Sequence, residues 1–256
     1  MGRDLLKNGF KTALLDKQPM IGLWCTLDGD TATEVAAVAG YDWLLFDTEH
    51  TPSSDRDVLR KLQTAAAYPV FPVVRPSSND RVRIKRLLDI GVQTLLIPYV
   101  ESEAEAVYAV GATRYPPAGK RGVAGAMRAA RYGTIQAYQA RADDEICVLV
   151  QIESRAGLDN LEAIASVEGV DGVFVGPADL AANCGLKLPE DSAELRKTIE
   201  SAFERIHKVG KPIGILSTVE PDARHYLNLG ATFVAIGVDT SLLMRSSADL
   251  AKRFKE

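Results

Sequence analysis

Short apolar runs alternate with longer amphipathic segments along most of the 256-residue chain. The apolar runs are rich in Val, Ile, Leu and Phe, and most of them end at a charged or turn residue. Continuous apolar runs separated by helical segments are typical of a parallel sheet that is buried on both faces. The pattern predicts eight strands, over residues 21–27, 42–47, 70–75, 94–100, 146–153, 173–179, 212–216 and 232–237.

The segments between these strands carry apolar residues at helical spacing. They predict an N-terminal extra helix over Arg3–Asp16, a helical segment between the fifth and sixth strands, and helices over 31–40, 55–67, 79–90, 101–113, 193–209, 221–229 and 241–254. Eight strands, each followed by a helix, predict an α/β fold with a single (β/α)8 TIM barrel over residues 1–256. A doubly wound sheet would need a glycine-rich phosphate turn early in the chain, and the sequence has none there. The irregular stretch 114–123 predicts an ordered loop with a functional role.

Composition narrows the function classes. The formal net charge is −4 and basic residues are scattered, so neither a nucleic acid nor an anionic membrane is an expected partner. No run approaches the roughly 20 apolar residues of a membrane span, and the first residues do not form a secretory signal, so we expect a cytoplasmic protein. Cys25, Cys147 and Cys184 are odd in number and far apart, which argues against a disulfide framework or a thiolate metal site.

Polar side chains collect where the predicted strands end. In a barrel these ends share one rim, where chemistry takes place. Glu153 and Asp179 follow successive strands, either as a pair of hard oxygen ligands or as an acid/base pair. Two carboxylates without clustered histidines favour Mg²⁺ or Mn²⁺ over zinc. The same rim receives four other polar residues: Asp47, His50, Arg75 and Gln151, the last on the same side of its strand as Glu153.

Each of these residues also has a purely structural interpretation. A carboxylate after a strand can cap a helix, Arg75 can form a structural ion pair, and a lone loop histidine such as His50 is usually solvated. His207 and His225 fall on predicted helices, away from the rim, and we assign them no role.

Long motifs in this chain resemble the HpcH/HpaI class II pyruvate aldolases. The resemblance runs nearly end to end and is carried by Phe46-Asp47-Thr48-Glu49-His50, Val74-Arg75-Pro76, Arg114-Tyr115-Pro116-Pro117-Ala118-Gly119, Gln151-Ile152-Glu153, residues 168–180 and Ala235-Ile236-Gly237-Val238-Asp239-Thr240. One departure is Thr48, which stands where the family usually has Gly. The resemblance implies a barrel of the phosphoenolpyruvate/pyruvate-binding type.

The activity implied is that of a carbon–carbon lyase that depends on Mg²⁺, Mn²⁺ or Co²⁺. Within the family, the chain is most similar to enzymes of aromatic catabolism that cleave 4-hydroxy-2-oxoheptanedioate to pyruvate and succinic semialdehyde. The alternative substrate is 5-keto-4-deoxyglucarate, which gives pyruvate and tartronate semialdehyde. Both reactions pass through a pyruvate enolate, which a divalent cation stabilises as a Lewis acid.

The resemblance also implies roles for individual residues. Glu153 and Asp179 become metal ligands, Arg75 polarises the keto oxygen, and His50 is the general base with Asp47 nearby. Asp89 matches a carboxylate that reaches His50 of a neighbouring subunit. Gln151 lies close to the metal, and the amides of Ala178 and Asp179 hold the pyruvate carboxylate. Specificity for the aldehyde falls to three outer positions: Trp24, Val123 and Leu216.

Assembly is part of this expectation. If Asp89 serves another subunit, the protein is an obligate homo-oligomer. In relatives the final barrel helix is exchanged between partners, giving a hexamer built from dimers. Leu242, Leu243 and Met244, together with Leu87 and Leu88 on the Arg-rich helix, are the apolar contact surface that the sequence offers for this association.

Three rival functions remain. A Schiff-base aldolase would need a lysine on an apolar strand, and none of the predicted strands contains one. Citrate-lyase-like or phosphoenolpyruvate-mutase-like chemistry would keep the enolate and change the reaction. A non-catalytic barrel would bind a metal or a small acid without turnover.

Overall fold

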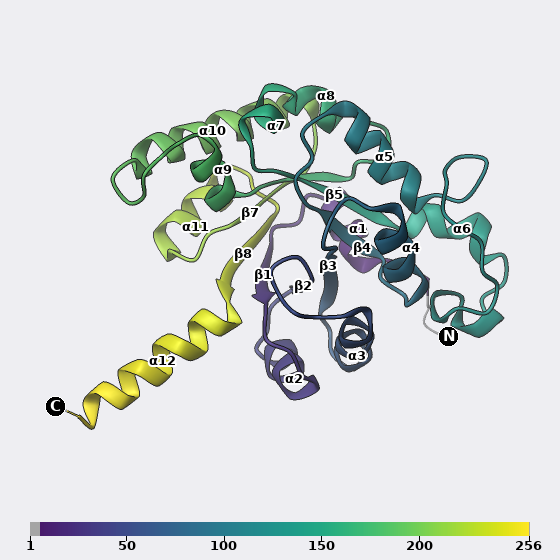
Figure 1. Cartoon of the computed structure of the whole chain (residues 1–256), viewed down its shortest axis with the longest axis horizontal. Helices are drawn as coiled ribbons and strands as arrows, with labels where there is room; N and C mark the ends of the chain where they lie inside the picture. Colours follow the sequence, from purple (N-terminus) through teal and green to yellow (C-terminus); the bar gives the residue numbers. More distant parts are fainter. Residues whose placement is uncertain (1–5, 256) are drawn as a thin grey trace.

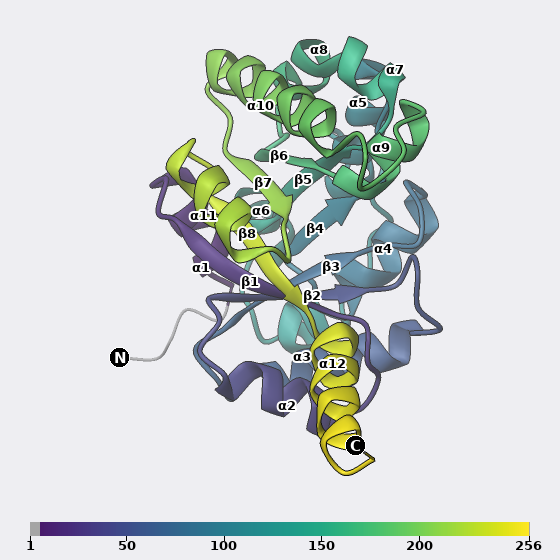
Figure 2. The ribbon, with the colours of Figure 1, turned by 90° about the vertical axis from the view of Figure 1, so that its left-hand side faces the viewer.

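The computed structural model describes residues 6–255 and shows a closed barrel of eight parallel strands, which pair in chain order (Figures 1 and 2). β8 pairs with β1 and closes the barrel. The prediction of a single (β/α)8 TIM barrel is therefore confirmed. The strands are β1 (Met20–Cys25), β2 (Trp43–Asp47), β3 (Phe71–Arg75), β4 (Thr94–Ile97), β5 (Cys147–Ile152), β6 (Gly172–Val175), β7 (Ile213–Leu216) and β8 (Phe233–Val238).

Helices surround this barrel. They are α1 (Gly9–Leu15), α2 (Asp30–Val38), α3 (Asp55–Ala65), α4 (Arg81–Asp89), α5 (Glu103–Thr113), α6 (Tyr138–Glu145), α7 (Arg155–Asp159), α8 (Leu161–Ser166), α9 (Pro177–Asn183), α10 (Ser192–Val209), α11 (Glu220–Asn228) and α12 (Asp239–Arg253), with a 3₁₀ helix η1 (Arg128–Gly133). No helix within residues 6–255 has both the length and the apolar character needed to cross a membrane.

The predicted elements differ from the structure mainly at their ends. β4 stops at Ile97 and β6 at Val175, earlier than predicted. β6 stops early because α9 begins at Pro177, whose fixed φ suits the first position of a helix. Residues 124–145, for which the hydrophobic pattern predicts no element, contain η1 and α6.

Two hydrophobic layers hold the fold together. The larger layer lies between the strands and the outer helices. The smaller one fills the barrel and includes Phe10 and Leu14 of α1, which are 1% and 0% exposed. Helix α1 therefore closes the end of the barrel where the strands begin. The N-terminal helix predicted from Arg3 begins at Gly9, and the first residues of that prediction lie outside the described part.

Helix α12 leaves the barrel and extends away from it (Figure 1). None of its residues is buried, and Leu242, Leu243 and Met244 are 38%, 57% and 69% exposed. Its first turn is anchored, because the Asp239 carboxylate accepts hydrogen bonds from the amides of Thr26 and Leu27 at 2.9 and 3.0 Å. These hydrogen bonds between Asp239 and residues 26–27 therefore orient α12 where it leaves the barrel.

The prediction that Leu87 and Leu88 form an intersubunit surface is wrong. These side chains are 2% and 0% exposed and belong to the layer between barrel and helices. The apolar face of α4 is covered by the same chain.

Candidate active site

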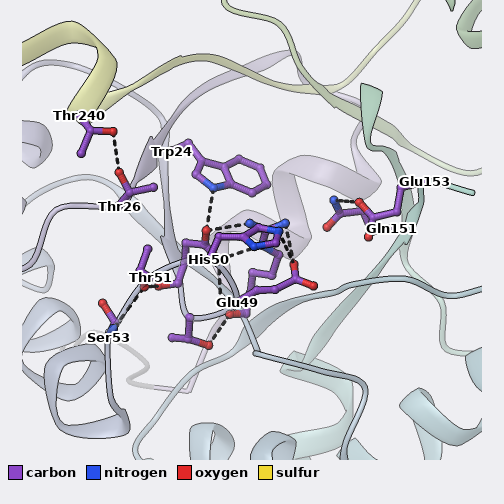
Figure 3. Close-up of polar contacts among 12 residues, drawn as sticks. Trp24, Thr26, Glu49, His50, Thr51, Ser53, Gln151, Glu153 and Thr240 are labelled. Atoms are coloured by element: carbon purple, nitrogen blue, oxygen red, sulfur yellow. Dashed lines mark hydrogen bonds and ion pairs between the residues drawn. The ribbon is translucent and has the colours of Figure 1, made fainter. Parts of the chain in front are cut away.

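The ends of β2 and β3 carry a buried ion pair. Parallel pairing places Asp47 directly beside Arg75. Arg75 Nε donates to Asp47 Oδ1 at 2.9 Å and Arg75 Nη2 donates to Asp47 Oδ2 at 2.7 Å. The Trp24 indole stacks on the guanidinium at 4.7 Å, and its Nε1 donates to Asp47 Oδ2 at 3.4 Å (Figure 3). Arg75 is thus held as a two-pronged fork in one orientation.

This pairing fixes the charge of Asp47. Burial alone raises the pKa of the carboxyl, but the hydrogen bonds and positive charge of Arg75 outweigh burial, and the pKa lies below its ordinary value. Asp47 is therefore ionised at neutral pH, and its charge is neutralised by Arg75.

Glu49 is a third member of this group, and sequence analysis gave it no role. Its Oε2 lies 2.8 Å from Arg75 Nη1 and 3.8 Å from His50 Nε2. Burial raises the pKa of Glu49 against the opposing charges of Arg75 and His50, with Asp47 and Asp179 adding to the rise. Glu49 is therefore the carboxylate beside His50, and within residues 6–255 Asp47 makes no hydrogen bond to that histidine. The position of Glu49 inside the Asp-Thr-Glu-His motif is the signal that could have revealed it.

The loop after β2 presents His50 outward. The His50 side chain is 64% exposed in the single chain. Thr48 donates its hydroxyl to the Arg75 carbonyl at 2.7 Å, and Thr51 donates its hydroxyl to the Asp47 carbonyl at 2.7 Å. Thr48 does not have a positive φ, so the threonine needs no glycine-like backbone here. Its hydroxyl instead ties the end of β2 to the end of β3.

Glu153, after β5, is buried, and among residues 6–255 it has no cationic partner. Its side chain accepts a hydrogen bond from the Tyr99 amide at 2.9 Å and another from Gln151 Nε2. Burial is the main cause that raises the pKa of Glu153 to about 7; the charges of Glu49 and Asp179 raise it further, while the Tyr99 amide and Arg75 lower it. Figure 3 shows Gln151 and Glu153 together, apart from the group around His50.

Two features of the backbone position the Glu153 side chain: one donates a hydrogen bond to it and the other leaves space for it. Tyr99 has a φ of 53°, a left-handed conformation that is strained for a tyrosine and that aims its amide at the carboxylate. Gly176 faces Glu153 across the β5–β6 pair, and a Cβ there would lie 2.6 Å from Glu153 Oε2. Neither feature is visible in the residue pattern, because both depend on backbone conformation and register.

Asp179 lies in the first turn of α9 and is partly buried. Its charge adds to the rise in the pKa of both Glu49 and Glu153. Four carboxylates, those of Asp47, Glu49, Glu153 and Asp179, thus lie at or after the ends of strands β2, β5 and β6, near the guanidinium of Arg75 at the end of β3. The rim has a surplus of negative charge on the β5–β6 side.

These residues fit an open site, in which two carboxylates hold a hard divalent cation, better than a closed site in which the protein supplies all the ligands. Within residues 6–255 no group of three or more His, Cys, Asp or Glu side chains is arranged to hold one ion. A pair of carboxylates is the protein ligand set with which Mg²⁺ is commonly bound, since it retains waters or takes substrate oxygens as further ligands. The buried, uncompensated carboxylate of Glu153 supplies the charge that such an ion would neutralise.

The remaining predicted residues occupy different places. Leu216 ends β7 and packs against the barrel interior, while Trp24 packs on Arg75. Val123 is 61% exposed in the loop after α5. Asp89 ends α4 and pairs with Arg121, and within residues 6–255 it makes no contact with His50. Ala178 is in the first turn of α9, which has no side-chain cap.

Comparison with known proteins identifies this architecture. The family model "HpcH/HpaI aldolase/citrate lyase" matches residues 20–246. The chain is 54% identical to hydroxypyruvate/pyruvate aldolase of Deinococcus radiodurans, covering 100% of this chain and 93% of that protein. It is 53% identical to 4-hydroxy-2-oxo-heptane-1,7-dioate aldolase of Shigella sonnei, covering 97% of this chain and 95% of that protein.

A solved structure agrees with this assignment. The crystal structure of a HpcH/HpaI aldolase/citrate lyase family protein from Burkholderia cenocepacia matches with a TM-score of 0.93 and 37% identity, over 98% of this chain and 100% of that chain. The family predicted from the sequence motifs, and with it a carbon–carbon lyase of the aldolase type, is confirmed. The chain belongs to the HpcH/HpaI aldolase/citrate lyase family.

Proposed function

We propose that the protein is a divalent-metal-dependent aldolase that reversibly cleaves 4-hydroxy-2-oxoheptanedioate to pyruvate and succinic semialdehyde. The observation that carries this proposal is a contrast on the rim: within residues 6–255 Glu153, after β5, is buried without an ion-pair partner, while the guanidinium of Arg75, at the end of β3, is rigidly held. A cation held at Glu153 would supply a second positive charge on the same rim, so that a bound keto acid could be contacted both by the cation and by Arg75.

Glu153 and Asp179 would hold the metal. When bound, a divalent ion supplies Lewis-acid polarisation of the substrate's keto oxygen. Gln151 orients Glu153 through its hydrogen bond, and the Tyr99 amide fixes the other carboxylate oxygen. We place Mg²⁺, Mn²⁺ or Co²⁺ here, because two carboxylates select for hard cations and not for a particular one.

Arg75 stabilises the charge that develops on the keto oxygen. Of its five N–H groups, two donate to Asp47, while Nη1 lies 2.8 Å from Glu49 Oε2 as an ion pair without a hydrogen bond, so N–H groups remain for substrate. Because its orientation is fixed before substrate arrives, no reorganisation is needed during the reaction. Asp47 and Trp24 act on the chemistry through this orientation.

His50 moves the proton. In the cleavage direction His50, directly or through a water, takes the proton of the 4-hydroxyl, the bond between carbons 3 and 4 breaks, and its electron pair passes into the pyruvate enolate as the aldehyde leaves. Returning a proton to carbon 3 gives pyruvate. The exposure of His50 in the single chain fits a site that is completed by another copy. The amides of Ala178 and Asp179, in the uncapped first turn of α9, are the donors we assign to the pyruvate carboxylate.

The complete enzyme is proposed to be a homo-oligomer, with Asp89 of one copy reaching His50 of another. The support is the projecting α12, none of whose residues is buried by residues 6–255, and the outward position of His50. A hexamer built from dimers that exchange α12 is the assembly we propose. A cytoplasmic location also stays a prediction.

Sequence identity does not tell which aldehyde this protein accepts, because two relatives named for different substrates are 54% and 53% identical to it. One assay panel tests the substrate. Pyruvate or hydroxypyruvate would be incubated with succinic semialdehyde, tartronate semialdehyde or glycolaldehyde, with Mg²⁺ and then with chelator. We expect the highest kcat/KM for pyruvate with succinic semialdehyde and no turnover with chelator. Preference for tartronate semialdehyde would favour 5-keto-4-deoxyglucarate, and full activity in chelator would overturn the proposal.

The Schiff-base rival has one buried lysine to consider. Lys61 is 1% exposed, but it lies on α3, outside the barrel, and pairs with Asp28 at 3.1 Å. It therefore does not face the rim occupied by Arg75 and Glu153. Borohydride reduction in the presence of pyruvate should leave no covalent adduct on the protein.

A further inference from the structure

Arg121, in the loop after α5, is a buried cation that the proposed reaction does not use. Its side chain is 0% exposed, and its Nη2 lies 3.1 Å from Asp89 Oδ1 and 3.5 Å from the Tyr138 hydroxyl. Its Nε and Nη1 are buried and have no hydrogen-bond partner within residues 6–255. Burying an arginine in this way is costly. Among residues 6–255, the hydrogen bonds of the Arg121 side chain go to Asp89 and Tyr138 alone.

Two aromatic rings fix the plane of this guanidinium. Its Cζ lies 4.5 Å from the centre of the Tyr115 ring and 5.8 Å from that of Tyr138. The loop that carries Arg121 is fixed as well, because the Arg121 amide donates to the Arg114 carbonyl at 2.8 Å. Gly119 in the same loop admits no side chain, since a Cβ would lie 2.4 Å from the Arg114 carbonyl oxygen. Arg121 is thus a rigid support.

Asp89 needs such a support. It is the last residue of α4, where the helix dipole disfavours a negative charge. Its side chain is 25% exposed, and only one of its two oxygens, Oδ1, is bonded to Arg121. Within residues 6–255 the other oxygen, Oδ2, makes no ion pair or hydrogen bond. The carboxylate is therefore tied on one side and open on the other.

We propose that Arg121 is the positioning residue that holds Asp89 in place for the proton-transfer step. This inference rests on the proposed function, in which Asp89 of one copy orients His50 of another. Arg121 sets the direction of the free oxygen and offsets the helix dipole, and it touches neither substrate nor metal. The alternative is an ion pair that only stabilises the fold.

A double-mutant cycle separates these roles. Arg121→Met and Asp89→Asn would be made singly and together, and kcat and KM measured on variants shown to be folded and assembled. We expect each single change to lower kcat by roughly 10²-fold, the scale of a general-base group, with little change in KM. In the Asp89→Asn background, Arg121→Met should change kcat by less than about twofold, because its target is already gone.

A matched control and a rescue accompany the cycle. Arg205→Met removes an ion pair with Glu162 on α8, remote from the rim, and should leave kcat unchanged. Arg121→Lys keeps the charge and should recover part of the lost kcat. Equal losses from Arg121→Met in both backgrounds, or full kcat in a folded Arg121→Met enzyme, would overturn the assignment.

Mixed oligomers test whether Arg121 acts in the subunit that supplies Asp89 or in the subunit that supplies His50. Inactive His50→Ala subunits would be co-refolded with Asp89→Ala subunits as the reference pair, and with Arg121→Met subunits as the test pair. Both mixtures should recover activity, because each forms sites with all three residues intact. A mixture of Arg121→Met with Asp89→Ala should not, because both defects fall on the same side.

The outcomes distinguish the inference from the proposed function beneath it. If the reference pair recovers no activity but the effects of Arg121→Met and Asp89→Asn are coupled in the cycle, the intersubunit site is wrong and the Arg121–Asp89 assignment still holds. Recovery in the reference pair without coupling in the cycle would remove the Arg121 assignment alone.

Discussion

Asp47 and Arg75, at the ends of β2 and β3, are 1% and 5% exposed and neutralise each other through two hydrogen bonds. After β5, two strands further along the barrel from β3, Glu153 is equally buried at 1%, yet neither it nor Asp179 has an ion pair with any residue of the described part of the chain, 6–255. Burial raises the pKa of both carboxyls, but at Asp47 the hydrogen bonds and charge of Arg75 outweigh it and the pKa lies below its ordinary value, whereas the pKa of Glu153 is raised to about 7. The comparison teaches that burial alone does not reveal function; the informative quantity is charge left without compensation.

The two sides also differ in how they are built. The β2–β3 side is closed by side chains, with Trp24 over the guanidinium and Glu49 beside it. The β5–β6 side is shaped by backbone, through the amide of Tyr99 and the missing side chain of Gly176. A preorganised cation and a buried, uncompensated carboxylate thus share the rim, which is an arrangement suited to binding a charged substrate.

Removing a carboxylate from the uncompensated side should have the largest effect. Glu153→Gln keeps the size of the side chain and Asp179→Asn does the same, but each removes a charge that we assign to the metal. We expect aldol cleavage to fall by roughly 10³-fold or more, the upper end for loss of one electrostatic group. The assay is pyruvate release at saturating metal; a near-normal rate in either variant would contradict the asymmetry.

Next in size is Arg75→Lys. Lysine retains the charge, but it lacks the planar fork that bonds both Asp47 oxygens while leaving other N–H groups directed at substrate. We expect cleavage to fall by about 10²-fold. Exchange of pyruvate methyl protons with deuterated water, followed by NMR, needs the same enolate and should fall in parallel. Loss of cleavage with normal exchange would argue that Arg75 does not stabilise the enolate.

Gly176→Ala tests whether the room beside Glu153 matters. The new Cβ would lie 2.6 Å from Glu153 Oε2 and 2.9 Å from Glu153 Cβ, so the carboxylate must move. We expect metal affinity to drop by about 10–100-fold, the range for disturbed support of a ligand, in a protein that still folds. Gly237→Ala is a matched control, since there a Cβ would lie no closer than 3.2 Å to its neighbours.

The pH dependence of the metal-free protein probes Glu153 directly. Its pKa is raised from the ordinary 4.5 to about 7, so between these values the folded state holds a proton that the unfolded state has released. Stability of the metal-free protein should therefore fall as pH rises through this window, by up to about 3 kcal/mol. The same proton competes with a cation, so metal affinity should weaken by up to roughly tenfold per pH unit below pH 7.

The predicted fall in stability with rising pH is checked by measuring the free energy of unfolding in chelator between pH 5 and 7.5, for the wild type and for Glu153→Gln. The variant lacks the titrating group and should show a flatter stability profile. A wild-type profile that rises through the window would show that Glu153 is ionised without a cation.

The smallest effect is expected from the compensated side. Trp24→Phe keeps an aromatic ring near Arg75 but deletes a long hydrogen bond, 3.4 Å, to a carboxylate that Arg75 already holds twice. We expect a loss of about 0.5–1.5 kcal/mol in transition-state stabilisation, which is the net value of one hydrogen bond. It would be measured as kcat/KM, and a loss as large as that of Arg75→Lys would mean that the indole touches substrate.

Apolar runs and their final residues were sufficient to predict the barrel and to bring Asp47, Arg75, Glu153 and Asp179 to one rim. The sequence could not show how these charges are distributed. The pairing of Asp47 with Arg75 depends on strand register, and the support of Glu153 depends on a positive φ at Tyr99 that residue type argues against. Leu87 and Leu88 were misassigned because an apolar helix face looks the same whether its own barrel or a partner covers it.

Direct metal binding tests the central claim, that the uncompensated β5–β6 carboxylates hold a cation and the neutralised β2–β3 pair does not. Mn²⁺ would be titrated into the wild-type protein, Glu153→Gln and Asp47→Asn, each shown to be folded, and free Mn²⁺ followed by electron paramagnetic resonance. We predict one site per chain in the wild type, retained in Asp47→Asn and lost in Glu153→Gln. Unchanged Mn²⁺ affinity in Glu153→Gln, or loss of the site in Asp47→Asn alone, would contradict the account.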